Sequence, residues 1–292
     1  MKDRIDPLIQ ERAPWLARGS LMARIATPAL HKMLCYNRTI SLAQDFRDRS
    51  AQDIMSRMRN LLAHRVTVQG RWNVPARGAA MIVANHPTGI ADALMLSAVL
   101  APIRDDAYYF ANSDILRVLP QMADVINPVE WRPEKRSRES LRATMTYTRS
   151  AVDDGRLGVI FPSGRLAKRV GMSLKERPWM TSAAMIARKF DLPIIPVNIQ
   201  ARNSAIFYLF DFLHPTLRDI TLFYETLNKV DTPFHITIGK PIAAQALPPT
   251  SEAATDILFD TTMALAPEQE KGAFPLLSRR EKQSWNSYAS LA

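Results

Sequence analysis

The sequence has a single cysteine, Cys35, and five histidines scattered along its 292 residues. One cysteine excludes an internal disulfide and is typical of a protein from a reducing compartment. The histidines and the cysteine also lack the spacing of a metal site. The sequence therefore predicts neither a disulfide-stabilised scaffold nor a metalloenzyme.

Long apolar runs are missing as well. No stretch approaches the roughly 18 uninterrupted apolar residues that a membrane-spanning helix needs. The first seven residues, Met-Lys-Asp-Arg-Ile-Asp-Pro, contain no apolar core of a secretory signal. We therefore expect no signal peptide and no transmembrane helix, and we expect a peripheral protein at the cytoplasmic face of the membrane.

Acidic residues are fewer than basic ones, 28 against 38, which gives a formal net charge of +10. Such an excess favours anionic partners, namely an anionic membrane surface, nucleic acid, or phosphorylated or thioester-phosphopantetheine substrates. No nucleic-acid-binding motif is present, and the aromatic residues lie in apolar runs instead of alternating with Arg and Lys. Nucleic acid is therefore not an expected partner, whereas a basic module that binds anionic lipid stays open as a non-enzymatic alternative.

Two common enzyme signatures are also missing. The chain has no Gly-x-x-x-x-Gly-Lys-Ser/Thr loop, which disfavours a P-loop nucleotide-binding enzyme. Ser163 follows an apolar strand, but a serine hydrolase needs Gly-x-Ser-x-Gly and position 161 is phenylalanine. A serine hydrolase is therefore discounted.

What the chain does contain is a regular alternation of short apolar strands with helices of ordinary length. Strands are expected at residues 65–70, 81–84, 108–111, 125–126, 157–161, 194–199 and 234–238. The segment 128–133, with its two prolines, is expected as a loop. This alternation predicts an α/β fold with a mainly parallel or mixed central sheet, flanked by helices on both faces.

The same patterns divide the chain into three parts. Residues 1–63 are predicted as an N-terminal helical region, which either associates with a membrane or packs on the main domain. Residues 64–242 are predicted as the α/β domain, and residues 243–292 as a C-terminal helix and tail.

A histidine stands where one predicted strand ends. After the apolar residues 81–84 the chain passes through His86 and a Pro-Gly loop into an apolar helix that carries Asp92 near its start. The carboxyl ends of strands are where open α/β sheets bind ligands. A neutral imidazole can take the proton of an attacking hydroxyl, while a carboxylate on its other nitrogen fixes the tautomer. The alternative is a buried histidine bonded to backbone, with Asp92 capping a helix.

Two basic segments follow other strands. The apolar strand at residues 157–161 ends at a Pro-Ser-Gly-Arg turn, residues 162–165. Successive backbone N–H groups beside a cation there suit a phosphate or a developing oxyanion. A second basic group occupies residues 128–138. For both segments the alternative is a solvated surface.

Together these motifs resemble the glycerolipid acyltransferases related to bacterial 1-acylglycerol-3-phosphate acyltransferase. Four features match the family in order: a His-Asp motif, a basic motif, a Phe-Pro-Glu-Gly turn and a closing strand that contains proline. In this sequence they are Asn85-His86 with Asp92, residues 128–138, residues 161–164 and residues 194–197.

The resemblance implies transfer of an acyl group from an acyl thioester, on acyl carrier protein or coenzyme A, to the hydroxyl of a lysolipid. It implies that His86 is the general base and Asp92 its orienting partner. It also implies a group of residues that bind the acceptor head group or the donor's phosphopantetheine: Arg132, Arg136, Ser163, Gly164 and Arg165. Phe207 and Phe210 would help to accommodate the acyl chain, with ordinary core packing as the alternative. No cofactor or metal is expected besides the thioester co-substrate.

Two departures from the family pattern bear on the acceptor. Five residues separate His86 from Asp92 where four are commonest, which resembles a hemolysin-like branch of the family. Ser163 stands where the family has glutamate, in the turn that is tied to holding the glycerol phosphate. We therefore expect a lyso-aminolipid acceptor, such as a lyso-ornithine lipid, with 1-acylglycerol-3-phosphate as the alternative.

Overall fold

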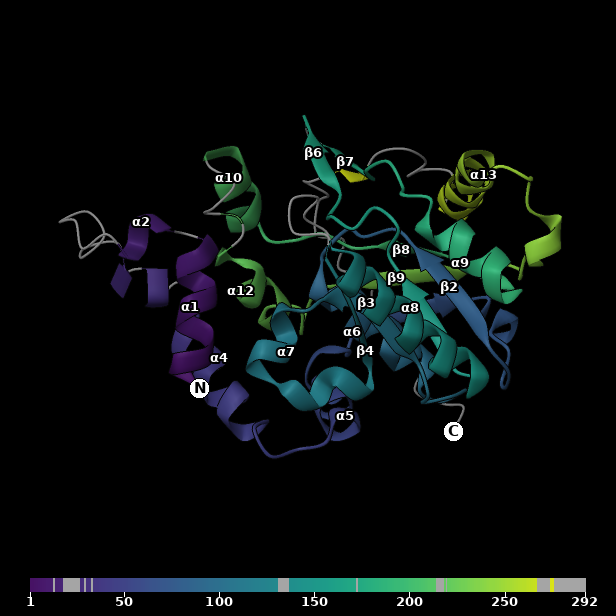
Figure 1. Cartoon of the computed structure of the whole chain (residues 1–292). Helices are drawn as coiled ribbons and strands as arrows, with labels where there is room; N and C mark the ends of the chain where they lie inside the picture. The colour runs from purple at the N-terminus through teal and green to yellow at the C-terminus, as the bar shows by residue number, and fades with distance from the viewer. Residues whose placement is uncertain are drawn as a thin grey trace, which may run out of the picture.

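The computed structural model describes residues 1–12, 14–17, 27–28, 30–32, 34–130, 137–171, 173–213, 218, 220–266 and 274–275. Within these residues a seven-stranded sheet has the order β1-β9-β8-β2-β5-β3-β4 (Figure 1). The strands, in that order, are Val66–Gln69, Phe234–Ile238, Ile194–Gln200, Ala80–Ala84, Leu157–Ile160, Tyr108–Asn112 and Ile126–Val129. From β8 to β4 all neighbours are parallel, whereas β9 is antiparallel to β8 and parallel to β1. The predicted mainly parallel, mixed sheet is confirmed.

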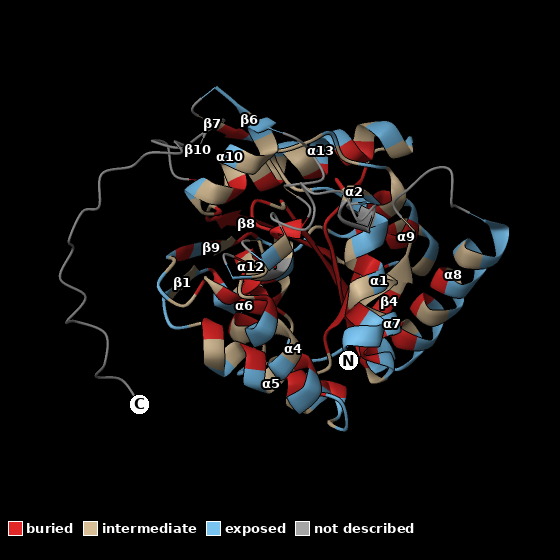
Figure 2. Ribbon diagram, turned by 90° about the vertical axis from the view of Figure 1, so that its left-hand side faces the viewer, coloured by how far each residue is buried: buried red, intermediate tan, exposed pale blue. Residues whose placement is uncertain are grey.

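Alternation along the strands divides the core between the two faces of the sheet. Strand β2 is buried throughout, and Ile82 and Ala84 pack in one apolar cluster while Met81 and Val83 pack in another. The first cluster includes residues of α5 (Ala51–Leu62), α6 (Ile90–Leu100) and α7 (Asp114–Val118). The second includes residues of α8 (Arg138–Asp153), α9 (Ser182–Phe190) and α13 (Ser251–Ala264). Figure 2 shows the buried strands between these two layers of helices, so helices cover both faces as predicted.

The N-terminal helices pack on the first face of the sheet. Helices α1 (Lys2–Arg12), α4 (Tyr36–Asp45) and α5 do so, and α2 (Pro14–Ala17) packs against α1. Ile5, Leu8 and Phe46 are buried in the cluster that also holds the sheet residues of that face. The Arg4 guanidinium donates to the Val118 carbonyl at 2.9 Å and joins α1 to α7. The predicted N-terminal helical extension is therefore present, and its association with a membrane stays a prediction.

The remaining elements are a small sheet, two helices and three 3-10 helices of the described residues. The small sheet has the order β10-β7-β6; its strands are Phe274–Pro275, Ser173–Lys175 and Lys168–Val170. The other helices are α10 (Ala205–Leu213), α12 (Leu222–Leu227) and the short 3-10 helices Arg71–Asn73, Pro120–Asp124 and Ala244–Ala246. Among all the helices of the described residues, none combines the length and the apolar character needed to cross a membrane.

One predicted loop is wrong at its start. The segment 128–133 was expected as a loop, but β4 continues through Pro128 and Val129. Strand β4 is at the edge of the sheet, where a proline is tolerated because the lost N–H removes no bond from a central ladder.

Candidate active site

The loop between β2 and α6 brings a histidine and a carboxylate together. His86 follows the last residues of β2, and Gly89 has a φ of 99°, a conformation that side-chain-bearing residues rarely adopt. This turn starts α6 at Ile90 and directs Asp92, in its first turn, back towards the end of the strand. His86 Nδ1 lies 2.9 Å from Asp92 Oδ2.

The Asp92 carboxylate is fully buried and saturated with donors. It accepts the backbone N–H groups of Thr88 and Gly89, each at 2.9 Å, and the Thr88 hydroxyl at 2.5 Å. Asp92 thus caps the start of α6, as the alternative predicted, and also contacts the His86 ring, as a catalytic pair requires, while the role of His86 as a base stays a prediction. When Asp92 is ionised it can only accept, so His86 Nδ1 carries the proton and Nε2 keeps its lone pair.

The His86 ring is partly buried at the wall of a large cavity. Its side chain is 17% exposed and stacks on Phe161, with 4.3 Å between the ring centroids. The cavity has a volume of about 1620 Å³. Such a volume exceeds the roughly 300–1,000 Å³ of most small-molecule sites, which suits a ligand with a long chain.

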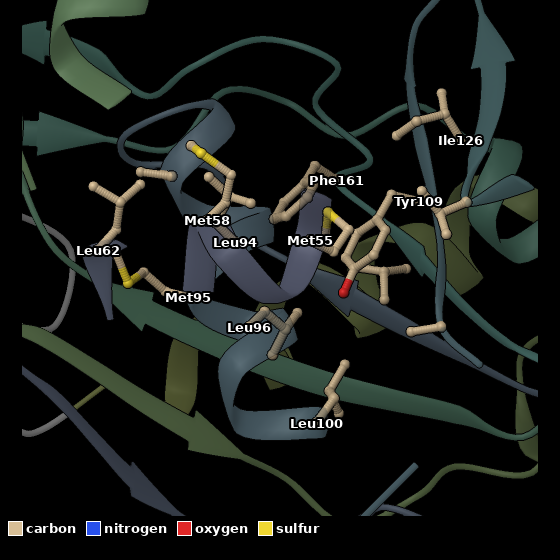
Figure 3. Packing of buried hydrophobic residues seen from close by; sticks show 14 of the residues in the cluster. Met55, Met58, Leu62, Leu94, Met95, Leu96, Leu100, Tyr109, Ile126 and Phe161 are labelled. Carbon is tan, nitrogen blue, oxygen red and sulfur yellow. The ribbon is translucent and has the colours of Figure 1, made fainter. Parts of the chain in front are cut away.

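Apolar side chains from both the N-terminal helices and the sheet line this cavity. They include Ile5, Leu8, Leu42, Phe46, Met55, Met58, Leu94, Tyr109, Ile126 and Phe161. Figure 3 shows Met55 and Met58 of α5 gathered with Leu94, Tyr109 and Phe161 in one apolar cluster. The N-terminal region thus contributes to the wall of the cavity on which His86 lies.

The turn after β5 places some of its predicted binding residues at the cavity and one away from it. Gly164, with a φ of 61°, and Arg165 line the cavity together with His86. Ser163 is buried, and its hydroxyl donates to the Arg165 carbonyl at 2.8 Å. Ser163 thus does not line the cavity, and its part in substrate binding stays a prediction. Arg132 and Arg136 lie outside the described residues.

Of the two phenylalanines predicted to contact the acyl chain, both on the aromatic helix α10, one lines the cavity and the other does not. Phe207 is buried and lines the cavity, where it packs edge-on against Tyr208 with 5.3 Å between ring centroids. Phe210 is half-buried and does not line it. The predicted acyl-chain contact is therefore compatible with the position of Phe207 and unsupported for Phe210.

The family described as Acyltransferase matches residues 65–200, the segment that holds His86, Asp92 and the turn at residues 162–165. These residues, just under half of the chain, are therefore described below as the acyltransferase domain. The protein is thus an acyltransferase, and its proposed catalytic groups lie within the matched domain.

Two curated relatives have the same name, lyso-glycine lipid O-acyltransferase. The protein from Phocaeicola vulgatus is 24% identical over 217 residues, which cover 72% of this chain and 76% of the relative. The protein from Bacteroides thetaiotaomicron is 23% identical over 247 residues, which cover 82% of this chain and 88% of the relative. A crystal structure of the 1-acyl-sn-glycerophosphate acyltransferase PlsC from Thermotoga maritima is 15% identical, with a TM-score of 0.48, covering 83% of this chain and 95% of that chain.

Basic residues that the sequence patterns did not single out also line the cavity, one inside the acyltransferase domain and one beyond it. Arg177 and Arg218 line the cavity together with Arg165. The Arg177 Nε donates to the Leu166 carbonyl at 2.9 Å. Burial and then the neighbouring Arg218 and Arg165 guanidinium groups lower the pKa of Arg177. The Arg218 guanidinium pairs with the Asp211 carboxylate at 3.1 Å, so three guanidinium groups face one carboxylate here and the net charge of this part of the cavity is positive.

Glu176 is a second residue of the acyltransferase domain that the sequence patterns missed. Its Oε2 accepts the backbone N–H of His86 at 3.1 Å. Burial raises the pKa of the Glu176 carboxyl, while the hydrogen bond from the His86 backbone N–H opposes the rise. Glu176 belongs to no recognised motif. The strands before it, β6 and β7, are only three residues long, too short to show the alternation that would predict a hairpin there.

A buried ion pair supports the loop that follows β8. Lys229 Nζ lies 2.7 Å from Glu225 Oε2, and both side chains are 1% exposed. Glu225 also accepts the backbone N–H of Ser204 at 2.9 Å, and the adjacent Asn203 amide donates to the Thr88 carbonyl at 3.4 Å. Burial lowers the pKa of Lys229, while Glu225 and then Asp92 oppose the change. The pair therefore links α12 to the loop that holds Asp92.

No group of three or more His, Cys, Asp or Glu side chains is arranged to hold a metal ion within the described parts of the chain.

Proposed function

We propose that the protein moves a fatty acyl group from an acyl thioester, carried by acyl carrier protein or coenzyme A, to the hydroxyl of a lyso-aminolipid. The observation that carries this proposal is the 2.9 Å contact of His86 Nδ1 with the buried Asp92 at the wall of an apolar cavity. A base at the wall of a cavity large enough for an acyl chain suits the activation of a hydroxyl next to an acyl group.

The proposed reaction needs no nucleophile from the protein. The lysolipid hydroxyl attacks the thioester carbonyl while His86 Nε2 takes its proton. The new C–O bond forms, the C–S bond of the tetrahedral intermediate breaks, and the imidazolium returns the proton to the leaving thiolate. Asp92 stabilises the imidazolium between the two transfers. The backbone and guanidinium groups at residues 164–165 line the same cavity and suit the oxyanion.

The acceptor is proposed to carry a carboxylate in its head group, as lyso-glycine and lyso-ornithine lipids do. The two curated relatives named as lyso-glycine lipid O-acyltransferases favour this class. The arginines at residues 165, 177 and 218 supply a positive potential for it. Ser163, in place of the family's glutamate, favours it over lysophosphatidate.

An anionic membrane surface at the cytoplasmic face is the proposed source of this lipid. Helix α10 exposes Leu209, Phe212 and Leu213. The Arg169 guanidinium lies 5.6 Å from the centroid of the Phe212 ring, so basic residues of β6 stand beside the apolar end of the helix. Apolar and basic side chains in one place suit the interface of an anionic bilayer.

An acceptor panel tests the proposed function. Purified protein is expected to form diacylated product from acyl-acyl carrier protein or acyl-coenzyme A with lyso-glycine or lyso-ornithine lipid, at a kcat/KM at least about tenfold above that for lysophosphatidate. The product is identified by mass spectrometry. A preference for lysophosphatidate would instead favour a phosphatidate-forming enzyme, and a lack of product from every acceptor would contradict acyl transfer to lysolipids.

Arg177→Met is expected to raise KM for the carboxylate-bearing acceptor by about tenfold, with kcat changed less than threefold. The reason is that a charge-assisted hydrogen bond or ion pair is lost, worth about 1.5 kcal/mol. KM for the acyl donor serves as the internal control and is expected to stay within twofold. A rise confined to the donor's KM would assign Arg177 to the phosphopantetheine instead.

A further inference from the structure

The main chain of His86 is held by the segment that joins β5 to α9. The His86 N–H donates to Glu176 Oε2 at 3.1 Å, and the His86 carbonyl accepts the Ala167 N–H at 2.8 Å. Asp92 fixes the imidazole ring. The ring and the backbone of the same residue are therefore held by different elements, α6 and the β5–α9 segment.

The Glu176 carboxylate is itself anchored to the scaffold. The Trp179 indole donates to its Oε1 at 3.2 Å. The Trp179 ring packs edge-on against Phe259 of α13, with 5.5 Å between centroids. A side chain fixed at both oxygens can hold the atom to which it is bonded in one place.

Glu176 is a partly buried carboxylate. Burial opposes its ionised form, and its hydrogen bonds offset that cost. Among the described residues its side chain is not one of those that line the cavity, whereas that of the next residue, Arg177, is. The hydrogen bond with functional consequence is the one to the His86 backbone.

We propose that Glu176 is the positioning residue of the active-site histidine: its carboxylate fixes the His86 backbone at the end of β2, from 90 residues away in the chain. Ser163, in the turn where the family has glutamate, has a hydroxyl that donates to the Arg165 carbonyl, and Glu176 supplies a carboxylate beside that turn. This proposal rests on the proposed function, in which His86 is the general base.

The first test compares Glu176→Met with Glu176→Gln. Met has a similar length and no comparable acceptor, so kcat is expected to fall about 10- to 100-fold, because a displacement of about 1 Å at a reacting group costs that much. KM for both substrates is expected to stay within threefold. Gln keeps an acceptor oxygen for the His86 N–H and is expected to retain at least a third of kcat. Glu252→Met, at an exposed position in the first turn of α13, is the matched control.

The second readout is amide hydrogen exchange, which does not depend on turnover. In Glu176→Met the peptide that covers residues 85–89 is expected to exchange at least tenfold faster than in the wild type, while the peptide of β5 is unchanged. If exchange is faster in Glu176→Met but the wild type shows no acyl transfer, the proposed function is refuted and the positioning role stands. If the wild type is active but exchange in Glu176→Met is unchanged, the positioning role is refuted and the proposed function stands.

Trp179→Phe provides a second test of the proposal in case the Glu176→Met protein does not fold. Phenylalanine retains an aromatic ring against Phe259 but removes the indole donor to Glu176. Its kcat is expected to fall about three- to tenfold with the melting temperature within a few degrees of the wild type. Unchanged kcat here, unchanged kcat in Glu176→Met, or a Gln variant as impaired as the Met variant would each overturn the proposal.

Discussion

Replacing His86 with alanine is expected to lower kcat for acyl transfer by about 10²- to 10⁴-fold, the usual contribution of a general acid–base group. The variant loses the imidazole that is placed to take the acceptor's proton. The apolar cavity and the guanidinium groups that line it are kept, so KM is expected to change little. The measurement is the initial rate of product formation at saturating thioester and lysolipid.

The control for His86→Ala is His64→Ala, because His64 is exposed just after the end of α5. Its kcat is expected to match the wild type. The double variant His86→Ala with Asp92→Asn is expected to be no slower than His86→Ala, because groups that act as a unit are lost together. Near-normal turnover of a folded His86→Ala protein would refute the proposed mechanism.

Lys229→Met is expected to lower the free energy of unfolding by about 3–5 kcal/mol, the usual cost of removing one partner from a buried ion pair. The Glu225 carboxylate would remain at 1% exposure without the ammonium that lies 2.7 Å from it. The bond from Ser204 would not compensate a full charge. Equilibrium unfolding in urea measures the change.

The double variant Lys229→Met with Glu225→Gln separates the lost charge from lost packing. It removes both charges and keeps an acceptor for Ser204, so it is expected to recover at least half of the loss. Lys240→Met, at an exposed position after β9, is expected to change the free energy of unfolding by less than about 0.5 kcal/mol. A double variant as unstable as Lys229→Met would show that packing, not the unpaired charge, sets the cost.

The sheet and the His86–Asp92 pair were predictable because their signals are local. A buried strand such as β2 is a continuous apolar run, and the residue that follows it marks the carboxyl end where a site forms. The spacing of six residues across a glycine turn then places Asp92 on the first turn of α6. Each of these features is contained in one short segment.

The supporting groups were not predictable because they come from distant segments. Glu176 meets His86 across 90 residues, and its neighbours β6 and β7 are too short to show a period of two. Glu225 lies in α12 and Lys229 two residues after its end, and a spacing of four residues usually marks an exposed pair. Their burial follows from packing against the loop after β8, which no local pattern encodes. The loop expected at residue 128 failed for a similar reason, since only the sheet order makes β4 an edge strand.

The pairing of β1 with β9 determines when the sheet can be completed during synthesis of the chain. Thr67 lies opposite His235, 168 residues later, and β1 has β9 as its neighbour at the edge of the sheet. At about 5–20 residues per second, a ribosome needs about 8–34 s to make the chain between them. During that time the nascent β1 has no partner strand, although the neighbouring segments have already been made. The sheet can close only after β9 leaves the exit tunnel, so we expect chaperones to bind the nascent chain most strongly in this interval.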